Sequence, residues 1–219
     1  MFLHTHPYPP YIPARATKLI VGTLPPPRFT TQNLKPGDVD FCYGSRDGQL
    51  WKILDRIFEL NLLFETSDEA VQQRKEFLNR HEIGICDIVE SARRDKVDAS
   101  DLGMQQVILR NMLEILVENE HVHTLLFMGG NSKNGPEYFF RRLLKQYDIN
   151  LEVLSSEVPR IHELSLPKSK RMITTVSLTA PSGAANRAVG SLQQYKELKN
   201  KNPEMNTIDF RVLQYKKFF

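Results

Sequence analysis

The sequence predicts an α/β protein with a short, mainly parallel sheet covered by helices on both faces. Short apolar runs alternate with segments whose apolar residues recur every three to four positions. Consecutive strands joined through helices pair in parallel, and both faces of such a sheet must be buried. The 219 residues, 41% hydrophobic and 25% charged, suffice for one sizeable core. We therefore expect a single domain, 1–219, with an irregular N-terminal arm over 1–17 and a C-terminal extension over 199–219.

Five short apolar runs are expected to form the strands. They are Lys18–Val21, Ile83–Cys86, Thr124–Met128, Leu151–Leu154 and Met172–Leu178. Ligands of open α/β sheets bind outside the carboxyl ends of the strands. Functional groups are therefore expected in the segments that follow these strands, over 22–27, 87–101, 129–134, 155–159 and 179–187.

Five amphipathic segments between or after the strands are expected to be helices. The first carries Leu50, Trp51, Ile53, Leu54, Ile57 and Phe58; the second Val71, Phe77 and Leu78; the third Val107, Ile108, Leu109, Met112, Leu113, Leu116 and Val117; the fourth Tyr138, Phe139, Leu143 and Leu144; the fifth Val189, Leu192, Tyr195 and Leu198.

Composition narrows the possible partners and cofactors. The net charge is only +3, so binding to nucleic acid requires locally clustered charge. The candidates for such a cluster are Arg93, Arg94, Lys168, Lys170, Arg171 and Arg187. Cys42 and Cys86 form no CxxC pair and the histidines form no HExxH pattern, so we expect two buried thiols and no metal. The proline-broken N-terminus predicts no signal peptide and no run predicts a membrane span, which favours a cytoplasmic protein.

Three segments carry unusual chemistry. Residues 22–27 combine a glycine with three prolines, which holds one backbone shape beside a ligand or simply ends a strand. Residues 43–54 set an aromatic side chain and a polar turn before an amphipathic helix. Residues 177–187 are small and polar and precede a helix, whose free amides can bind phosphate oxygens.

These segments occur in a recognisable order. GTLPPP at 22–27, YGSRDGQLWKIL at 43–54, ICDIVESARRDKVDASD at 85–101, LLFMGG at 125–130 and SLTAPSGAANRA at 177–188 together resemble the uracil-DNA glycosylase superfamily. The resemblance extends over 18–198 and is strongest to the hypoxanthine-DNA and mismatch-specific (thymine/uracil) branches. It implies a three-layer α/β/α sandwich that flips a deaminated or modified base out of DNA and hydrolyses its N-glycosidic bond in base excision repair. It further implies no cofactor, damaged DNA as partner, no membrane, and a cytoplasmic monomer associated with the bacterial nucleoid.

The resemblance also assigns roles around the base. Tyr43 matches the aromatic that stacks on the flipped base, with Phe41 as the nearby alternative. Leu24 stands in the water-activating loop where the family often has Asp or Asn, so it walls the pocket without orienting water. Gly48 occupies the place of an expected Asn. The adjacent Asp47 is the candidate water-orienting carboxylate, or else the cap of the following helix.

Two further candidates lie at the next strand exits. Asp87 matches a position near the base edge, where it accepts a hydrogen bond from the base or else fixes its own loop. Asn131 is expected to touch the base, and Asp98 and Asp101 are weaker, exposed-looking candidates.

The last motif is expected to grip DNA. Its residues are Pro181, Ser182, Gly183, Asn186 and Arg187, and Pro25 of the first motif is expected to join them. Ala180 replaces a histidine that many members use to support the leaving base. Together with Leu24 and Gly48, this departure keeps a second hypothesis open: a catalytically impaired DNA-binding protein of the same fold. A nucleotide-binding enzyme unrelated to repair is a more distant alternative.

Overall fold

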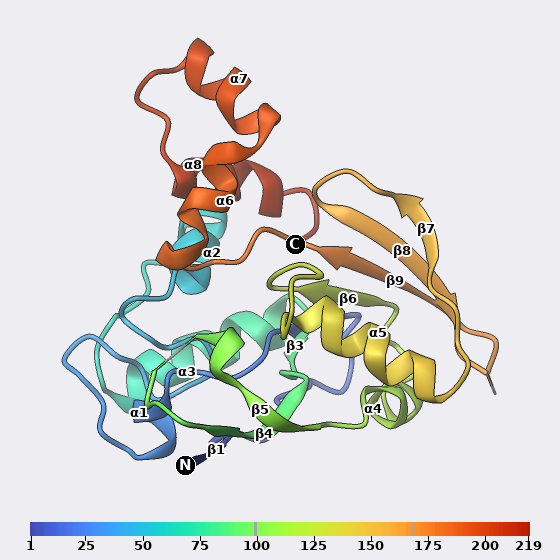
Figure 1. Cartoon of the computed structure of the whole chain (residues 1–219). Coiled ribbons are helices and arrows are strands. Elements are labelled where there is room, and N and C mark those ends of the chain that lie inside the picture. Colours follow the sequence, from blue (N-terminus) through green and yellow to red (C-terminus); the bar gives the residue numbers. More distant parts are fainter. Residues whose placement is uncertain (99, 168) are drawn as a thin grey trace.

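The computed structural model describes residues 1–98, 100–167 and 169–219, so the prediction for Lys168 lies outside the described residues. The main sheet contains β2 Lys18–Val21, β3 Ile83–Ile85, β6 Thr124–Phe127, β7 Glu152–Ser155, β8 Arg160–Ser165 and β9 Met172–Ser177. Its order is β3-β2-β6-β9-β8-β7 (Figure 1). The neighbours β3, β2, β6 and β9 pair in parallel, while β8 runs antiparallel to β9 and β7 antiparallel to β8. The predicted mainly parallel sheet is confirmed.

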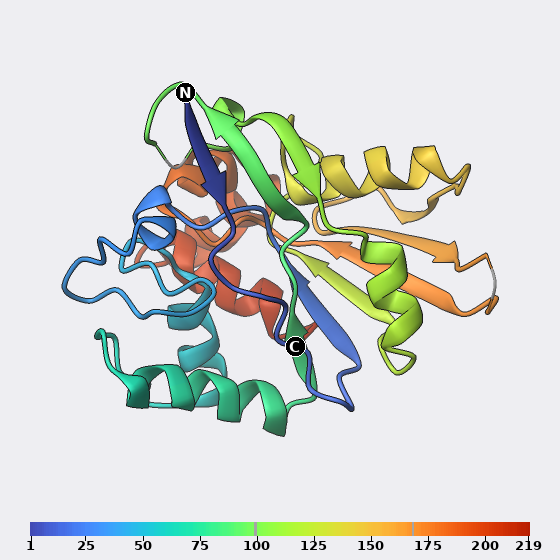
Figure 2. The ribbon, with the colours of Figure 1, turned by 90° about the horizontal axis from the view of Figure 1, so that it is seen from below.

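Helices cover both faces of this sheet. Within the central strands, Leu19 and Leu125 point into one apolar core and Ile20 and Leu126 into the other, because successive side chains of a strand alternate. The first core is closed by α4 Met112–Glu118 and α5 Pro136–Gln146. The second is closed by α2 Leu50–Phe58, α3 Asp68–Arg80 and α8 Thr207–Tyr215. Figure 2 shows the sheet between these two layers, as in an α/β/α sandwich.

Local sequence explains where these helices begin. Ser67, Asn111 and Asn206 accept backbone N–H groups at the starts of α3, α4 and α8, and Pro136 occupies the first turn of α5. Trp51 of α2 is 2% exposed and donates from Nε1 to the carbonyl of Cys42 at 2.8 Å. Its predicted role as a core residue is confirmed.

A second, antiparallel sheet was not predicted. It is formed by β1 Phe2–Thr5, β4 Val89–Arg94 and β5 Gln105–Leu109, in the order β1-β4-β5. Three sequence-based assignments were wrong here. The first residues were assigned to an irregular arm, the segment after 87 to a strand exit, and 107–109 to a helix. The three consecutive apolar residues Val107, Ile108 and Leu109 fit a helix or a strand equally well, and only pairing with β4 makes them a strand.

Two features at the edge of the main sheet also differ from expectation. The strand β8 was not predicted, and the predicted run Leu151–Leu154 forms an edge strand, β7, shifted by one residue. Val153 and Leu154 are 61% and 58% exposed, because β7 pairs with β8 alone. Apolar composition therefore identified a strand here but not its burial.

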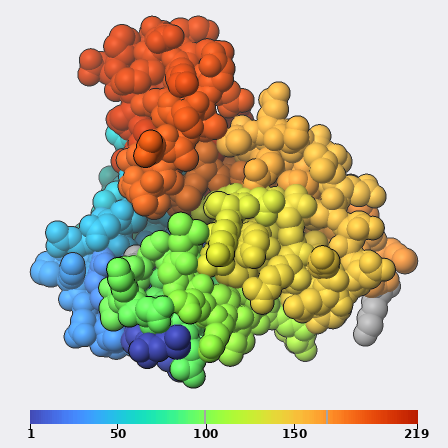
Figure 3. Space-filling model, in the orientation of Figure 1, coloured from blue at the N-terminus to red at the C-terminus, as the bar shows by residue number. Residues whose placement is uncertain are grey.

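The C-terminal helices pack in two different places. The helices α6 Asn186–Ser191 and α7 Gln193–Lys201 project from the sandwich (Figures 1 and 3) around a small apolar cluster that includes Tyr195 and Phe210. The next helix, α8, returns to the sheet, where Tyr215 is fully buried and its hydroxyl donates to the carbonyl of Thr179 at 2.7 Å. Apolar residues of the last segment, from Ile208 to Phe219, thus pack against the second core. Among the described helices, none is long and apolar enough to cross a membrane.

Candidate functional site

The loops after β2, β3, β6 and β9 meet at one edge of the sheet, called here the carboxyl edge, because these four strands run in parallel. A cavity of about 230 Å³ opens there. It lies between the segments 128–130 after β6 and 177–180 after β9, and Asp101 and Arg160 also line it. Residues of three sequence motifs, over 85–101, 125–130 and 177–188, therefore line one concave surface.

One wall of this cavity is held by a buried carboxylate. Glu137, at the start of α5, is fully buried and accepts from Arg160 at 2.6 Å, from Arg141 at 2.9 Å and from the Ser177 hydroxyl at 2.6 Å. These donors keep the pKa of Glu137 below its usual value despite burial. The contacts fix the Arg160 side chain, which lines the cavity.

Asp87 joins three segments of the chain through its two carboxylate oxygens. Its Oδ1 accepts from the backbone N–H of Gly22 at 2.7 Å and from the Tyr43 hydroxyl at 2.9 Å. Its Oδ2 lies 3.0 Å from Nε2 of His6. The side chain is 6% exposed. Of the two roles that the sequence left open, these contacts match a residue that fixes the loops, and a contact with the base stays a prediction.

Tyr43 lies against the first motif. Its hydroxyl reaches Asp87 over Gly22, where an added Cβ would come within 2.1 Å of the hydroxyl oxygen, so only glycine fits. Burial and the charge of Asp87 raise the pKa of Tyr43 well above its usual value, which keeps the hydroxyl a donor. Its ring is half-buried, whereas Phe41 is 5% exposed and packs on Trp51. Tyr43 is thus the more accessible of the two stacking candidates.

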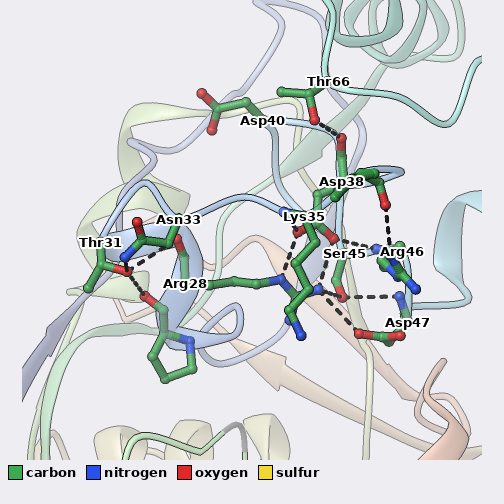
Figure 4. A network of polar contacts seen from close by, with 12 residues as sticks. Arg28, Thr31, Asn33, Lys35, Asp38, Asp40, Ser45, Arg46, Asp47 and Thr66 are labelled. Carbon is green, nitrogen blue, oxygen red and sulfur yellow. Dashed lines mark hydrogen bonds and ion pairs between the residues drawn. The ribbon is translucent and has the colours of Figure 1, made fainter.

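Asp47 lies in a polar network around Arg28 and Asp38 (Figure 4). Its side chain is 70% exposed, and its Oδ2 accepts from Arg28 at 3.2 Å. The same guanidinium makes two shorter bonds, of 2.7 and 2.8 Å, to the buried Asp38, whose pKa these and backbone donors lower to about 2. Ser45 also accepts from Arg28. The network fastens the polar turn to the segment after β2, and a catalytic role for Asp47 stays a prediction.

The polar turn and the last motif are joined directly. Gly48 forms a β-bridge with Ser182, and the N–H of Gln49 donates to the carbonyl of Pro181 at 2.9 Å. The α2 N-cap is Gln49, without a side-chain cap, so Asp47 does not cap that helix. An added Cβ at Gly48 would lie 3.0 Å from the carbonyl oxygen of Ser45, which leaves little room for the expected asparagine.

Arg211 forms hydrogen bonds with both segments of this junction. It is fully buried on α8, and it donates to Gln49 at 3.0 Å, to Asn186 at 2.9 Å and to the carbonyl of Ser182 at 3.2 Å. Sequence reasoning missed it, because a lone arginine in an amphipathic helix normally points to solvent.

The other predicted site residues differ in exposure. Leu24 is half-buried and packs against the core between the sheet and α5, and Pro25 is half-buried. Asn131, Gly183 and Arg187 are exposed at the carboxyl edge, while Pro181 is buried. Because they are exposed, Asn131, Gly183 and Arg187 are free to contact a ligand.

Among the described residues, the basic side chains predicted from the sequence do not form one cluster. Lys170 and Arg171 precede β9, whereas Arg187 follows it, so they lie at opposite ends of the strand. Arg94 is 1% exposed and donates to His4 at 2.8 Å. Lys170, Arg171 and Arg187 are near one another in the sequence, but β9 separates Lys170 and Arg171 from Arg187 in space.

Asp101 is less exposed than the sequence suggested. It begins the 3-10 turn Asp101–Gly103, is half-buried, and lines the cavity. Its Oδ1 accepts from the Thr23 hydroxyl at 2.8 Å, and its carbonyl accepts from Asn134 at 2.9 Å. The surrounding charge run looked like a solvated face, and only the tertiary structure turns this one acid toward the site.

The cysteines agree with the sequence interpretation. Cys42 and Cys86 are buried free thiols, and burial raises the pKa of Cys86 to about 12, so it is not a nucleophile at neutral pH. In the described part of the chain, no three His, Cys, Asp or Glu side chains are grouped to hold a metal ion.

Comparison with known proteins agrees with this architecture. A solution NMR structure from Methanosarcina acetivorans, described as a "putative Uracil DNA glycosylase", superposes with a TM-score of 0.55, at 15% identity, over 96% of this chain and 99% of that one. The two chains share a fold. No protein-family model and no curated protein matches this sequence. The shared fold covers almost the full length of both chains, so the predicted three-layer α/β sandwich is confirmed.

Proposed function

We propose that the protein is a monofunctional DNA glycosylase that flips a deaminated or modified base out of DNA and hydrolyses its N-glycosidic bond. The observation that carries this proposal is the convergence of all five sequence motifs on one cavity-bearing edge. A protein of the same fold whose description names uracil DNA glycosylase supports it.

The size and lining of the cavity fit a single base. At about 230 Å³ it is smaller than the roughly 300–1,000 Å³ of pockets for drug-sized ligands. Arg160 lines the cavity and offers a hydrogen-bond donor to the carbonyl oxygen that uracil and hypoxanthine both carry. The sequence motifs favour the hypoxanthine-DNA and mismatch-specific branches.

The proposed roles follow the motifs. Tyr43 is not among the described residues that line the cavity, and its motif position is what assigns it to stacking on the extruded base. Asp87 holds the loops around Gly22 and Tyr43. Asp47 stays a candidate for orienting water by its motif position alone. The segment 181–187 grips the DNA backbone, with exposed Arg187 beside phosphate. During the reaction, negative charge grows on the departing base and positive charge on the sugar, so donors at the base and a carboxylate near the sugar both lower the barrier.

The competing hypothesis is a DNA-binding protein of this fold without excision activity. Leu24, Gly48 and Ala180 support it, because each replaces a polar group that the motifs lead one to expect. The two hypotheses differ in the product that is formed, not in binding.

An excision assay separates them. Duplex and single-stranded oligonucleotides carrying uracil, hypoxanthine, xanthine or 5-hydroxymethyluracil are incubated with the full chain, and abasic sites are measured by alkaline cleavage. Release of one of these bases at a rate proportional to enzyme concentration supports the glycosylase. Binding with a steep salt dependence but no release would leave the DNA-binding hypothesis.

Replacing Tyr43 tests the stacking role. We expect Tyr43→Ala to weaken binding of DNA with an extrudable base by about 1–3 kcal/mol, because stacking on the base is lost. Tyr43→Phe keeps the ring and serves as the control for loss of the bond to Asp87. The measurement is the difference in Kd between damaged and undamaged duplexes, and an unchanged difference for Tyr43→Ala would exclude stacking.

A further inference from the structure

Hydrolysis of a glycosidic bond needs a group that orients water and accepts its proton, and the first motif has none, since Leu24 is apolar. The neighbouring Thr23 is the polar side chain of that loop, and its hydroxyl donates to Asp101 at 2.8 Å. A carboxylate from the turn after β4 therefore stands beside the loop in which the expected acid is missing.

Three carboxylates are candidates for the group that orients water, and their contacts distinguish them. Both oxygens of Asp87 are occupied, by Gly22 and Tyr43 on one and by His6 on the other, and 6% exposure leaves no room for water. Asp47 is 70% exposed and pairs with Arg28, and it is not among the described residues that line the cavity. Asp101 lines the cavity, and its Oδ2 accepts no hydrogen bond from the described part of the chain.

Asp101 is also held in place. The side chain of Asn134, from the loop after β6, donates to the carbonyl of Asp101 at 2.9 Å and to that of Met104 at 3.1 Å. Asn134 is 6% exposed. The turn that carries Asp101 is thus attached to two strand exits, at Thr23 and at Asn134, so the free oxygen has a fixed direction.

We propose that Asp101 is the catalytic carboxylate of this site and acts as the general base for the attacking water. The assignment rests on the proposed glycosylase function. Oδ2 of Asp101 accepts a proton from water as the water oxygen bonds to C1′ of the deoxyribose. The C1′–N bond breaks, its electron pair leaves with the base, and the base anion is protonated by solvent. Thr23 positions the carboxylate through Oδ1.

The electrostatic surroundings agree with this role. Burial raises the pKa of Asp101 above its usual value, and the nearby charge of Asp87 adds to this, while Thr23 and Arg94 oppose it. A carboxylate with a raised pKa is a stronger base than one in water.

The test compares four proteins in single-turnover excision of whichever of the four bases the wild type releases. Asp101→Asn keeps the shape but removes the base, and we expect a loss of about 100-fold or more. Thr23→Val is expected to lose less, because it only frees the carboxylate. Asp98, the other weak candidate from the sequence, is 48% exposed and is not among the described residues that line the cavity. Asp98→Asn is therefore the matched control, because it makes the same change of charge in the same loop away from the cavity, and it should retain wild-type activity.

Binding and folding readouts make the result decisive. For Asp101→Asn we expect the Kd for damaged duplex and the thermal midpoint to stay close to those of Asp98→Asn. Excision by Asp101→Asn within about threefold of Asp98→Asn would overturn the assignment while leaving the glycosylase proposal intact. A loss of excision matched by an equal loss of DNA binding or of folding would overturn it as well, in favour of a structural role. If the wild type releases no base, both proposals fall.

Discussion

At the scale of single residues, the site depends on close contacts that allow little substitution. Asp87 gathers Gly22, Tyr43 and His6, which are separated by many residues in the chain. Glycine and proline at 22–27 identified this segment from the sequence as a rigid loop. The contact that makes Gly22 indispensable, the hydroxyl of Tyr43, depends on the tertiary structure.

We expect Gly22→Ala to lower the free energy of unfolding by about 1–3 kcal/mol, because the new methyl group overlaps the Tyr43 hydroxyl. Gly190→Ala is the control: nothing lies within 4 Å of its added Cβ in α6, and helix propensity should stabilise it by about 0.5–1 kcal/mol. Urea unfolding of both variants measures the difference. Equal stabilities would contradict the close packing of Tyr43 on Gly22.

At the scale of secondary-structure elements, the unpredicted sheet β1-β4-β5 is important because its turn between β4 and β5 carries Asp101. Its first strand contains His4, which is fully buried and accepts from Arg94 through Nδ1 at 2.8 Å. Burial and the charges of Arg94 and His6 lower the pKa of His4 from 6.5 to about 4.

This histidine predicts a pH dependence of stability. Between about pH 6.5 and pH 4 the unfolded chain binds a proton at His4 that the folded chain excludes, so stability falls as pH falls through this range. We expect His4 to contribute about 1–2 kcal/mol to the loss at pH 5 relative to pH 7. His4→Gln keeps an acceptor without titrating, so its thermal midpoint should fall less over this range. An identical pH dependence in the two proteins would refute the role of His4.

At the scale of the whole molecule, a net charge of +3 makes any DNA affinity a local property of the carboxyl edge. The projecting helices α6 and α7 stand beside this edge (Figure 3), and Arg187 lies exposed in the first turn of α6. Lys145 lies in the last turn of α5, at the opposite end of that helix from Pro136, which lines the cavity.

We expect Arg187→Ala to reduce the slope of log K against log salt concentration for duplex binding by about 1, because one phosphate contact is lost. Lys145→Ala removes the same charge away from the carboxyl edge and should leave the slope unchanged. Fluorescence anisotropy over a salt series measures both. Equal slopes for these two variants would show that DNA does not approach this edge through Arg187.

The sequence by itself determined the alternation of strands and helices, the parallel core, the edge at which its motifs gather and the burial of Trp51, because these follow from local periodicity and turn chemistry. Only the tertiary structure decided the second sheet, the strand β8 and which of the candidate acidic residues lines the cavity. The contacts of Gly22 with Asp87 and of Thr23 with Asp101 span 65 and 78 positions. Local patterns cannot distinguish a solvated acid from one that the fold carries to a cavity, since both have the same neighbours in the chain.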